Sequence, residues 1–173
     1  MEQIRTRKSH PYDIVQIIKD DHRNLKALLS TLKDDNEPYL KKQEAFQKLA
    51  LLLEAHVGPE LETWYKCLKY EHRFTVEISE GELEHRLALQ ICKDMEATTS
   101  EGSFMLKARV LAEMALHQIM VEERDLLPEL DVATTLDKRI ELGLIYLEMQ
   151  RHIEVLQNSE HHLYPHSSPD QLQ

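Results

Sequence analysis

The apolar residues of this chain recur at spacings of three and four along most of its length, and strict alternation of apolar and polar residues is rare. Such spacings place side chains on one face of an α-helix, because a helical turn takes about 3.6 residues. The pattern predicts five helical segments, which span roughly residues 11–33, 39–70, 76–97, 104–128 and 133–157.

Polar residues and prolines set the predicted boundaries of these segments. Pro11 suits the first turn of a helix, residues 34–38 form a polar connector, and Ser103 is predicted to be the N-cap of the fourth segment. Pro59 falls inside the second segment, where its missing amide hydrogen predicts a kink or a bulge.

The order and lengths of these segments predict an all-α fold, an up-down four-helix bundle with an additional C-terminal helix that covers one side. Residues 11–158 are predicted to form this single domain. Residues 1–10 would be an N-terminal arm. Residues 159–173 contain little apolar surface and are predicted to be a partly disordered tail.

Composition narrows the class of protein. The chain has 173 residues, of which 42% are hydrophobic, so it can bury a substantial core. A formal charge of −10 and the absence of a basic stripe argue against a nucleic-acid partner. No long apolar run is present, which argues against a transmembrane span, and we expect neither a secretory signal in the first residues nor a membrane partner. Cys67 and Cys92 form no C-x2-C pair, as is typical of a reducing compartment, so we expect a cytoplasmic protein. The sequence does not identify a protein partner.

Histidines fall on the apolar face of each of the first four segments. His22 lies between Ile18 and Leu25 at helical spacing, and the other three are similarly placed among apolar residues. Each of these segments is therefore predicted to turn one imidazole inward. The four residues are His22, His56, His85 and His117.

Two glutamates accompany these histidines. Glu60 follows His56 by four residues, and Glu122 follows His117 by five. A buried carboxylate costs several kcal/mol unless it is paired, and a pair of cations would remove that cost. The set therefore predicts a dinuclear metal centre in which Glu60 and Glu122 bridge the ions and the imidazoles are terminal ligands. Zinc remains open because imidazole and carboxylate both suit it.

A ferritin-like di-iron site fits the sequence less well than this set does. Such a site needs two Glu-x-x-His motifs, together with a glutamate on each of two other helices. Here only Glu82-x-x-His85 has the required placement.

The ordered motifs resemble those of the hemerythrin-like, HHE cation-binding family. They are Asp21-His22, His56-Val57-Gly58-Pro59-Glu60, Glu84-His85 and the segment from His117 to Glu122, followed in two places by Trp64-Tyr65 and Leu126-Leu127-Pro128. The resemblance covers roughly residues 11–128. It implies a four-helix bundle with a non-haem centre of two iron ions, bridged by carboxylates and an oxo or hydroxo group. Other divalent metals are alternatives.

The sequence departs from that family's pattern in ways that lead to further expectations. Val121 stands where an i+4 carboxylate would be, so a π-bulge between His117 and Glu122 is expected to restore convergence. Gly81 stands where hemerythrins carry a second histidine one turn before His85, and Glu82, Glu84 or water would substitute. Trp64 and Tyr65 are expected to pack at the end of the bundle. Glu123 is expected to support the site from outside or to face solvent.

The resemblance implies that the centre binds or reacts with a small diatomic ligand, dioxygen or nitric oxide, or with peroxide. Simple reversible oxygen carriage is put in doubt by Gly81. An alternative is an iron- or oxygen-responsive regulatory or iron-handling module without catalytic turnover. The sequence leaves open whether the protein is an enzyme. A bundle without metal, in which the histidines are ordinary core residues, is the remaining alternative.

Overall fold

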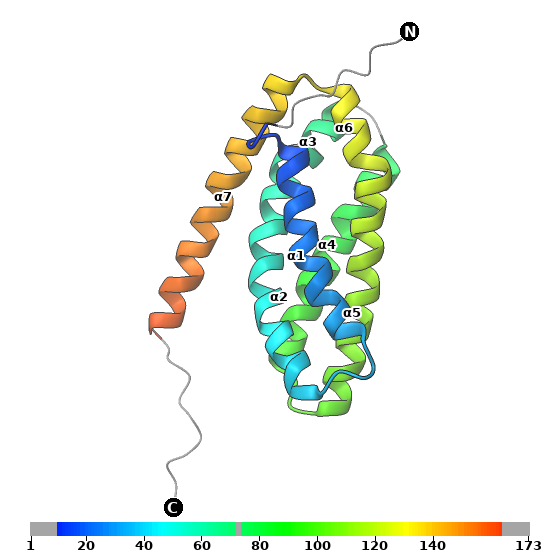
Figure 1. Ribbon diagram of the computed structural model, residues 1–173, viewed down its shortest axis with the longest axis vertical. Coiled ribbons are helices and arrows are strands. Elements are labelled where there is room, and N and C mark those ends of the chain that lie inside the picture. Colours follow the sequence, from blue (N-terminus) through cyan, green and yellow to red (C-terminus); the bar gives the residue numbers. More distant parts are fainter. Residues whose placement is uncertain (1–9, 72–73, 164–173) are drawn as a thin grey trace, which may run out of the picture.

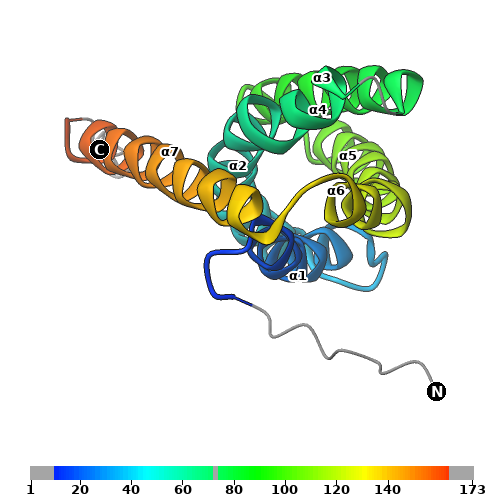
Figure 2. The same cartoon turned by 90° about the horizontal axis from the view of Figure 1, so that it is seen from above.

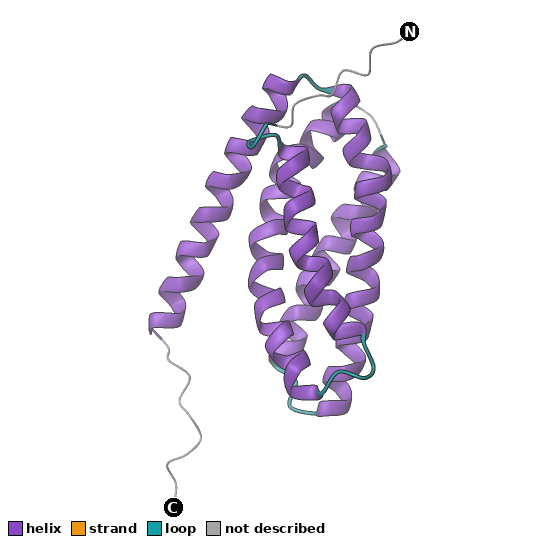
Figure 3. Cartoon of the chain, viewed as in Figure 1, coloured by secondary structure: helices purple, strands orange, loops and turns teal. Residues whose placement is uncertain are grey.

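The computed structural model describes residues 10–71 and 74–163, and within them all regular secondary structure is helical (Figure 3). The predicted all-α class is therefore confirmed. The elements, in chain order, are α1 (Ile14–Lys33), α2 (Tyr39–Glu60), the π-helical turn η1 (Leu61–Tyr65), α3 (Lys66–Tyr70), α4 (Thr75–Glu96), α5 (Glu101–Val121), the π-helical turn η2 (Glu122–Leu126), α6 (Leu127–Ala133) and α7 (Leu136–Leu163).

Helices α1, α2, α4 and α5 lie side by side with their axes roughly along the long axis of the molecule (Figure 1). Helix α1 packs against α2 and α5, and α4 packs against α5. Helix α7 lies outside this group against α1 and α2, and its C-terminal end points away from the other helices (Figure 2). It is the additional helix that the sequence predicts.

Two apolar clusters fill the interior, one toward each end of the long helices. The first includes Leu25, Leu29 and Leu49, and the second includes Ile14, Ile18 and residues of η1, α6 and α7. On α1 the change from one cluster to the other occurs between Ile18 and Leu25, which is where His22 lies. A layer of buried polar side chains is therefore enclosed between two apolar layers.

Helix starts differ from the sequence prediction because side-chain caps fix them at other residues. Helix α1 begins at Ile14 rather than Pro11, since the Asp13 carboxylate accepts a hydrogen bond from the Val15 amide. Helix α5 is capped by Ser100, whose hydroxyl accepts from the Ser103 amide, so the prediction of Ser103 as the N-cap was wrong. In both cases the capping residue is the one whose side-chain oxygen reaches an otherwise unpaired amide of the first turn.

Pro59 lies within α2, and the π-helical turn η1 begins two residues after it, in agreement with the predicted irregularity. The Pro59 carbonyl accepts a hydrogen bond from the Thr63 hydroxyl at 2.6 Å. Residues 1–9 of the predicted arm and 164–173 of the predicted tail lie outside the described residues, and α7 continues past the predicted start of the tail at residue 159. Among the described residues, no helix has both the length and the apolarity that crossing a membrane requires.

Candidate metal centre

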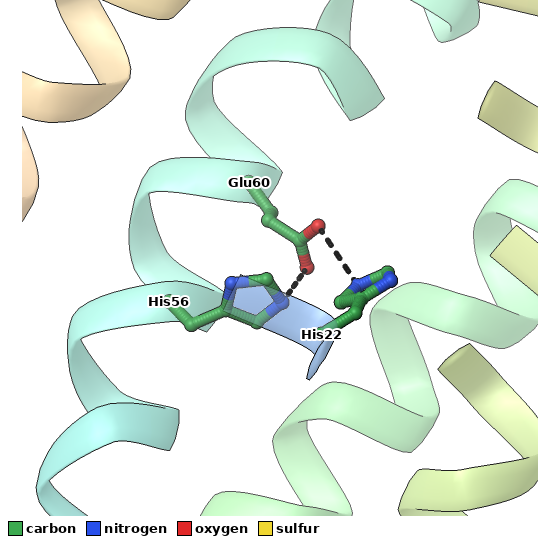
Figure 4. A group of neighbouring side chains, drawn as sticks. All are labelled: His22, His56 and Glu60. Atoms are coloured by element: carbon green, nitrogen blue, oxygen red, sulfur yellow. Dashed lines mark ion pairs between the residues drawn. The ribbon is translucent and has the colours of Figure 1, made fainter. Parts of the chain in front are cut away.

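Five of the six side chains predicted as ligands meet in the polar layer between the two apolar clusters. They come from α1, α2, α4 and the first residue of η2, and each is at most 5% exposed. Their ligand atoms form two groups that share one carboxylate, with the atoms of each group within 4.8 Å of one another. The groups are His22, His56 and Glu60 (Figure 4), and Glu60, His85 and Glu122.

The first group is built on one turn of α2 and one residue of α1. Nε2 of His56 lies 3.1 Å from Oε2 of Glu60, as expected for residues four apart on a helix. Nε2 of His22 lies 3.9 Å from Oε1 of the same carboxylate (Figure 4). The two imidazoles therefore face opposite oxygens of Glu60, and Pro59 does not prevent their convergence.

The second group extends the cluster toward α4 and η2. Nε2 of His85 lies 3.4 Å from Oε2 of Glu60 and 3.5 Å from Oε1 of Glu122. Oε2 of Glu122 in turn lies 3.1 Å from Nε2 of His22. Glu60 thus faces imidazoles from three helices and Glu122 faces imidazoles from two, an arrangement that suits bridging ligands.

Four buried polar atoms of the cluster have no hydrogen-bond partner: His22 Nε2, Glu60 Oε2, His85 Nδ1 and Glu122 Oε2. His22 Nε2 and Glu122 Oε2 are within ion-pair distance, but not in hydrogen-bond geometry. Each unsatisfied buried group costs about 1–3 kcal/mol. Imidazole nitrogens and carboxylate oxygens with free lone pairs are the ligands that iron and zinc accept, so the residues present fit a metal centre.

The charges within the cluster shift its pKa values. Burial alone would lower the pKa of His56, but the charge of Glu60 and the close contacts with Asp21 and Glu60 raise it to about 10. Burial alone would raise the pKa of Glu122, but the close contact with His22 and the charges of His85 and His22 lower it to about 2. A bound cation would compensate the charges of the two carboxylates inside the cluster.

His117 does not join the cluster, so the prediction that it faces inward was wrong. Its side chain is 59% exposed, and its Nδ1 lies 3.8 Å from Oε1 of Glu84 on the surface. Helix α5 is regular through Val121, and the π-helical turn starts at Glu122 rather than between the two residues. A residue five positions before Glu122 therefore points about 100° away from the i+4 position.

Gln118 occupies the inward position that the sequence analysis assigned to His117. It is buried, and its Nε2 donates to Oε1 of Glu122 at 3.0 Å and to the Tyr65 hydroxyl at 2.6 Å. The spacing of four between Gln118 and Glu122 was the signal for this register, but an amide is a weak metal ligand, and the neighbouring histidine was therefore predicted to face inward instead.

The space next to Gly81 is filled by the side chains of Tyr65 and Gln118. A Cβ atom at Gly81 would lie 2.5 Å from the Tyr65 hydroxyl oxygen and 2.6 Å from Gln118 Nε2. The Tyr65 hydroxyl donates to Oε1 of Glu122. The space beside position 81 is therefore taken by the buried side chain of Tyr65, whose hydroxyl is hydrogen-bonded to Glu122.

The acidic side chains expected to substitute at Gly81 are engaged elsewhere. Glu82 pairs with Lys69 at 2.9 Å, and Glu84 faces His117. Trp64 and Tyr65 are buried, as expected of packing residues, but they also donate hydrogen bonds to the carboxylates of the cluster. Trp64 Nε1 donates to Oε1 of Glu60 at 3.1 Å. Trp64 follows Glu60 by four residues, so helical spacing was the signal for this contact, but the sequence prediction treated the indole as a packing group rather than as a donor.

Other polar groups support the imidazoles from outside the cluster. Glu123 Oε1 lies 3.2 Å from Nδ1 of His22 and accepts a hydrogen bond from Lys26 at 2.7 Å, which agrees with the predicted supporting role. On the other side, Nδ1 of His56 lies 2.8 Å from the hydroxyl of Tyr146, a residue of α7 that the sequence analysis did not single out.

A small cavity of about 20 Å³ adjoins the second group. Its lining combines polar residues, among them His85, Gln118 and Glu122, with apolar side chains. A cavity needs about 10–15 Å³ to hold one water molecule, so this space accommodates a molecule of that size. The apolar lining residues are Leu25, Leu53, Ala88, Met114, Ala115 and Ile119.

Comparison with known protein families gives a match over most of the chain. The family model described as Hemerythrin HHE cation binding domain matches residues 13–130. This range contains all five residues of the cluster and ends before α7. Neither the curated proteins nor the solved structures include a significant match.

Proposed function

This chain belongs to the hemerythrin HHE cation-binding family, and on that premise we propose that it is a non-haem di-iron protein that binds or reacts with dioxygen, nitric oxide or peroxide. The observation that carries the proposal is the pair of three-residue groups that share Glu60, in which four buried atoms have no hydrogen-bond partner. Within the same proposal, α1, α2, α4 and α5 form the up-down four-helix bundle and α7 covers it.

The ligand set supports two ions rather than one. His22, His56 and Glu60 would hold one ion, and His85, Glu60 and Glu122 the other, so that Glu60 bridges the pair. Three imidazoles and two carboxylates are more ligands than a single tetrahedral zinc ion needs. They are also fewer than two six-coordinate ions require, and this leaves open positions for water or an external ligand.

Iron in such a site supplies one-electron chemistry and an open coordination position for a small ligand. The chain's own groups determine what can approach it. The 20 Å³ cavity beside His85 and Glu122 admits only a molecule of a few atoms, and its apolar wall favours an uncharged one. The carboxylates of Glu60 and Glu122 are oriented by hydrogen bonds from Trp64 and Tyr65.

The direct test is the absorption spectrum of the protein loaded anaerobically with Fe(II), before and after addition of dioxygen, nitric oxide or hydrogen peroxide. We expect at least one of these ligands to change the spectrum. A protein that retains iron but responds to none of the three would contradict the proposed reactivity, and the iron-handling alternative would then be favoured.

The cavity offers a more selective test. Ala88→Val adds two methyl groups at the cavity wall, whereas Ala45→Val adds the same groups at a buried position of α2 that does not line the cavity. We expect both variants to retain iron and only Ala88→Val to slow or abolish ligand binding. Equal ligand-binding rates in the two variants would show that the cavity is not the binding space.

A further inference from the structure

Helix α7 reaches the metal centre through Tyr146, although it lies beyond the residues that match the family. Tyr146 is fully buried, and its hydroxyl oxygen lies 2.8 Å from Nδ1 of His56. The same hydroxyl donates its hydrogen to Oδ2 of Asp21 at 2.6 Å. Because a hydroxyl group carries a single proton, the Tyr146 oxygen is left as the acceptor for His56.

These contacts determine which nitrogen of His56 is available to a metal. If Tyr146 accepts from Nδ1, that nitrogen carries the hydrogen, and the lone pair lies at Nε2. Nε2 is the atom that faces Glu60 at 3.1 Å. A partner that holds the outer nitrogen of a ligating histidine typically fixes both the tautomer and the direction of the ring.

The same network connects α7 to α1. Oδ2 of Asp21, the residue before His22, also accepts a hydrogen bond from Nε2 of Gln150 at 3.0 Å. Helix α7 thus supplies two donors, Tyr146 and Gln150, to one carboxylate on α1, and the Asp21 carboxylate lies 3.4 Å from Nδ1 of His56. The network therefore joins α1, α2 and α7 at the edge of the ligand cluster.

The attachment of α7 is strongest in the half that contains Tyr146. Leu142 and Tyr146 are buried in the second apolar cluster, whereas Val155 and Leu156 are 56% and 52% exposed. Arg139 is buried and pairs with Asp13 at 3.1 Å. A substitution of Tyr146 therefore affects the half of α7 that is packed against the rest of the protein.

We propose that Tyr146 is a positioning residue of the metal centre and that, through it, metal binding and the docking of α7 stabilise each other. This inference rests on the proposed metal binding. If docked α7 raises metal affinity by a given factor, bound metal must favour the docked helix by the same factor. The docking of α7, which lies on the outside of the other helices, would then depend on whether the centre holds metal. This dependence favours a regulatory role beside the proposed ligand chemistry.

The test compares the wild type with Tyr146→Phe and with a matched control, Tyr39→Phe. The control removes a hydroxyl that accepts from Gln43 Nε2 at 2.9 Å on α2, remote from the cluster. Two quantities are measured: the anaerobic Fe(II) affinity by competition with a chelator, and the amide hydrogen exchange of α7 with and without Fe(II). Gln150→Leu, which removes the other donor to Asp21 without contacting His56, is measured in parallel.

We expect Tyr146→Phe to weaken Fe(II) binding by about 10–100-fold, the usual effect of losing such a partner. Gln150→Leu should weaken it less, and Tyr39→Phe should bind as the wild type does. Fe(II) should slow exchange in α7 of the wild type and of Tyr39→Phe, and much less in Tyr146→Phe. This wild-type exchange measurement remains decisive even if a variant folds poorly.

Two results would overturn the inference. One is wild-type Fe(II) affinity in a folded Tyr146→Phe variant, and the other is α7 exchange that does not respond to Fe(II) in the wild type. Either result, obtained with a wild type that binds Fe(II), leaves the proposed function intact. A wild type that binds no Fe(II) contradicts both the proposed function and the inference.

Discussion

The substitution Gly81→Ala tests whether the side chains of Tyr65 and Gln118 fill the space beside the second ligand group. The added Cβ atom would lie 2.5 Å from the Tyr65 hydroxyl oxygen, 2.6 Å from Gln118 Nε2 and 3.0 Å from Cε1 of the Tyr65 ring. Tyr65 is fully buried, and its hydroxyl is bound to both Glu122 and Gln118. It cannot move away without losing these bonds.

The expected magnitude follows from three opposing contributions. Replacing glycine by alanine inside a helix stabilises by about 1 kcal/mol. Overpacking a filled core costs about 1–3 kcal/mol, and losing a hydrogen bond to a charged group costs about 1.5–3 kcal/mol. The net effect is a loss of about 1.5–5 kcal/mol in the free energy of unfolding.

The assay is urea denaturation of the metal-free protein, with Gly102→Ala as the matched control. Gly102 is also helical, in the first turn of α5, and a Cβ there would meet no atom within 4 Å. We expect the control to be neutral or slightly stabilising. The double variant Gly81→Ala/Tyr65→Phe should recover part of the loss, because the atom closest to the new methyl group is removed. Equal stabilities of Gly81→Ala and Gly102→Ala would refute this account of the packing.

The remaining predictions concern the cluster itself. In the metal-free protein, the raised pKa of His56, about 10 against 6.5, contributes stability that is complete below pH 6.5 and lost as the pH rises toward 10. The lowered pKa of Glu122, about 2 against 4.5, contributes stability that is complete above pH 4.5 and lost as the pH falls toward 2. Denaturation at a series of pH values should therefore show the greatest stability between about pH 4.5 and 6.5. In His56→Gln, the free energy of unfolding should fall less steeply above pH 6.5 than in the wild type. An unchanged fall in that range would contradict the assignment to His56. His85→Ala should lose bound metal and His117→Ala should retain it, as measured by elemental analysis; loss in His117→Ala alone would mean that the exposed residue is the ligand.

Helical periodicity was sufficient to predict most of the fold. The spacing of apolar residues located every long helix, and the break before Thr75 and the extra C-terminal helix were also anticipated. The ends were less accurate, because a cap depends on which side-chain oxygen reaches a free amide. Asp13 and Ser100 do so here, whereas the sequence predicted a start at Pro11 and a cap at Ser103.

The sequence predicted the residues of the cluster correctly where regular helical spacing determines their positions. His56 and Glu60 converge because they are four residues apart, and His22 and His85 continue apolar faces. The error at His117 arose from favouring residue type over helical spacing.

The long-range hydrogen-bond partners could not have been found from the sequence. Tyr65 contacts Glu122 across 57 positions, and Tyr146 contacts Asp21 across 125. Pairs so far apart in the chain are brought together only by the packing of whole helices, and no local pattern encodes such a pairing.

The central claim, a dinuclear centre built on Glu60, is tested most directly by counting metal ions in the folded protein. The wild type and Glu60→Ala are loaded anaerobically with Fe(II), freed of unbound ion by gel filtration, and analysed for iron and protein. The shared position of Glu60 in both groups predicts about two irons per chain in the wild type and a loss of both in Glu60→Ala. A wild type without bound metal, or a Glu60→Ala variant with the same iron content as the wild type, would contradict the account.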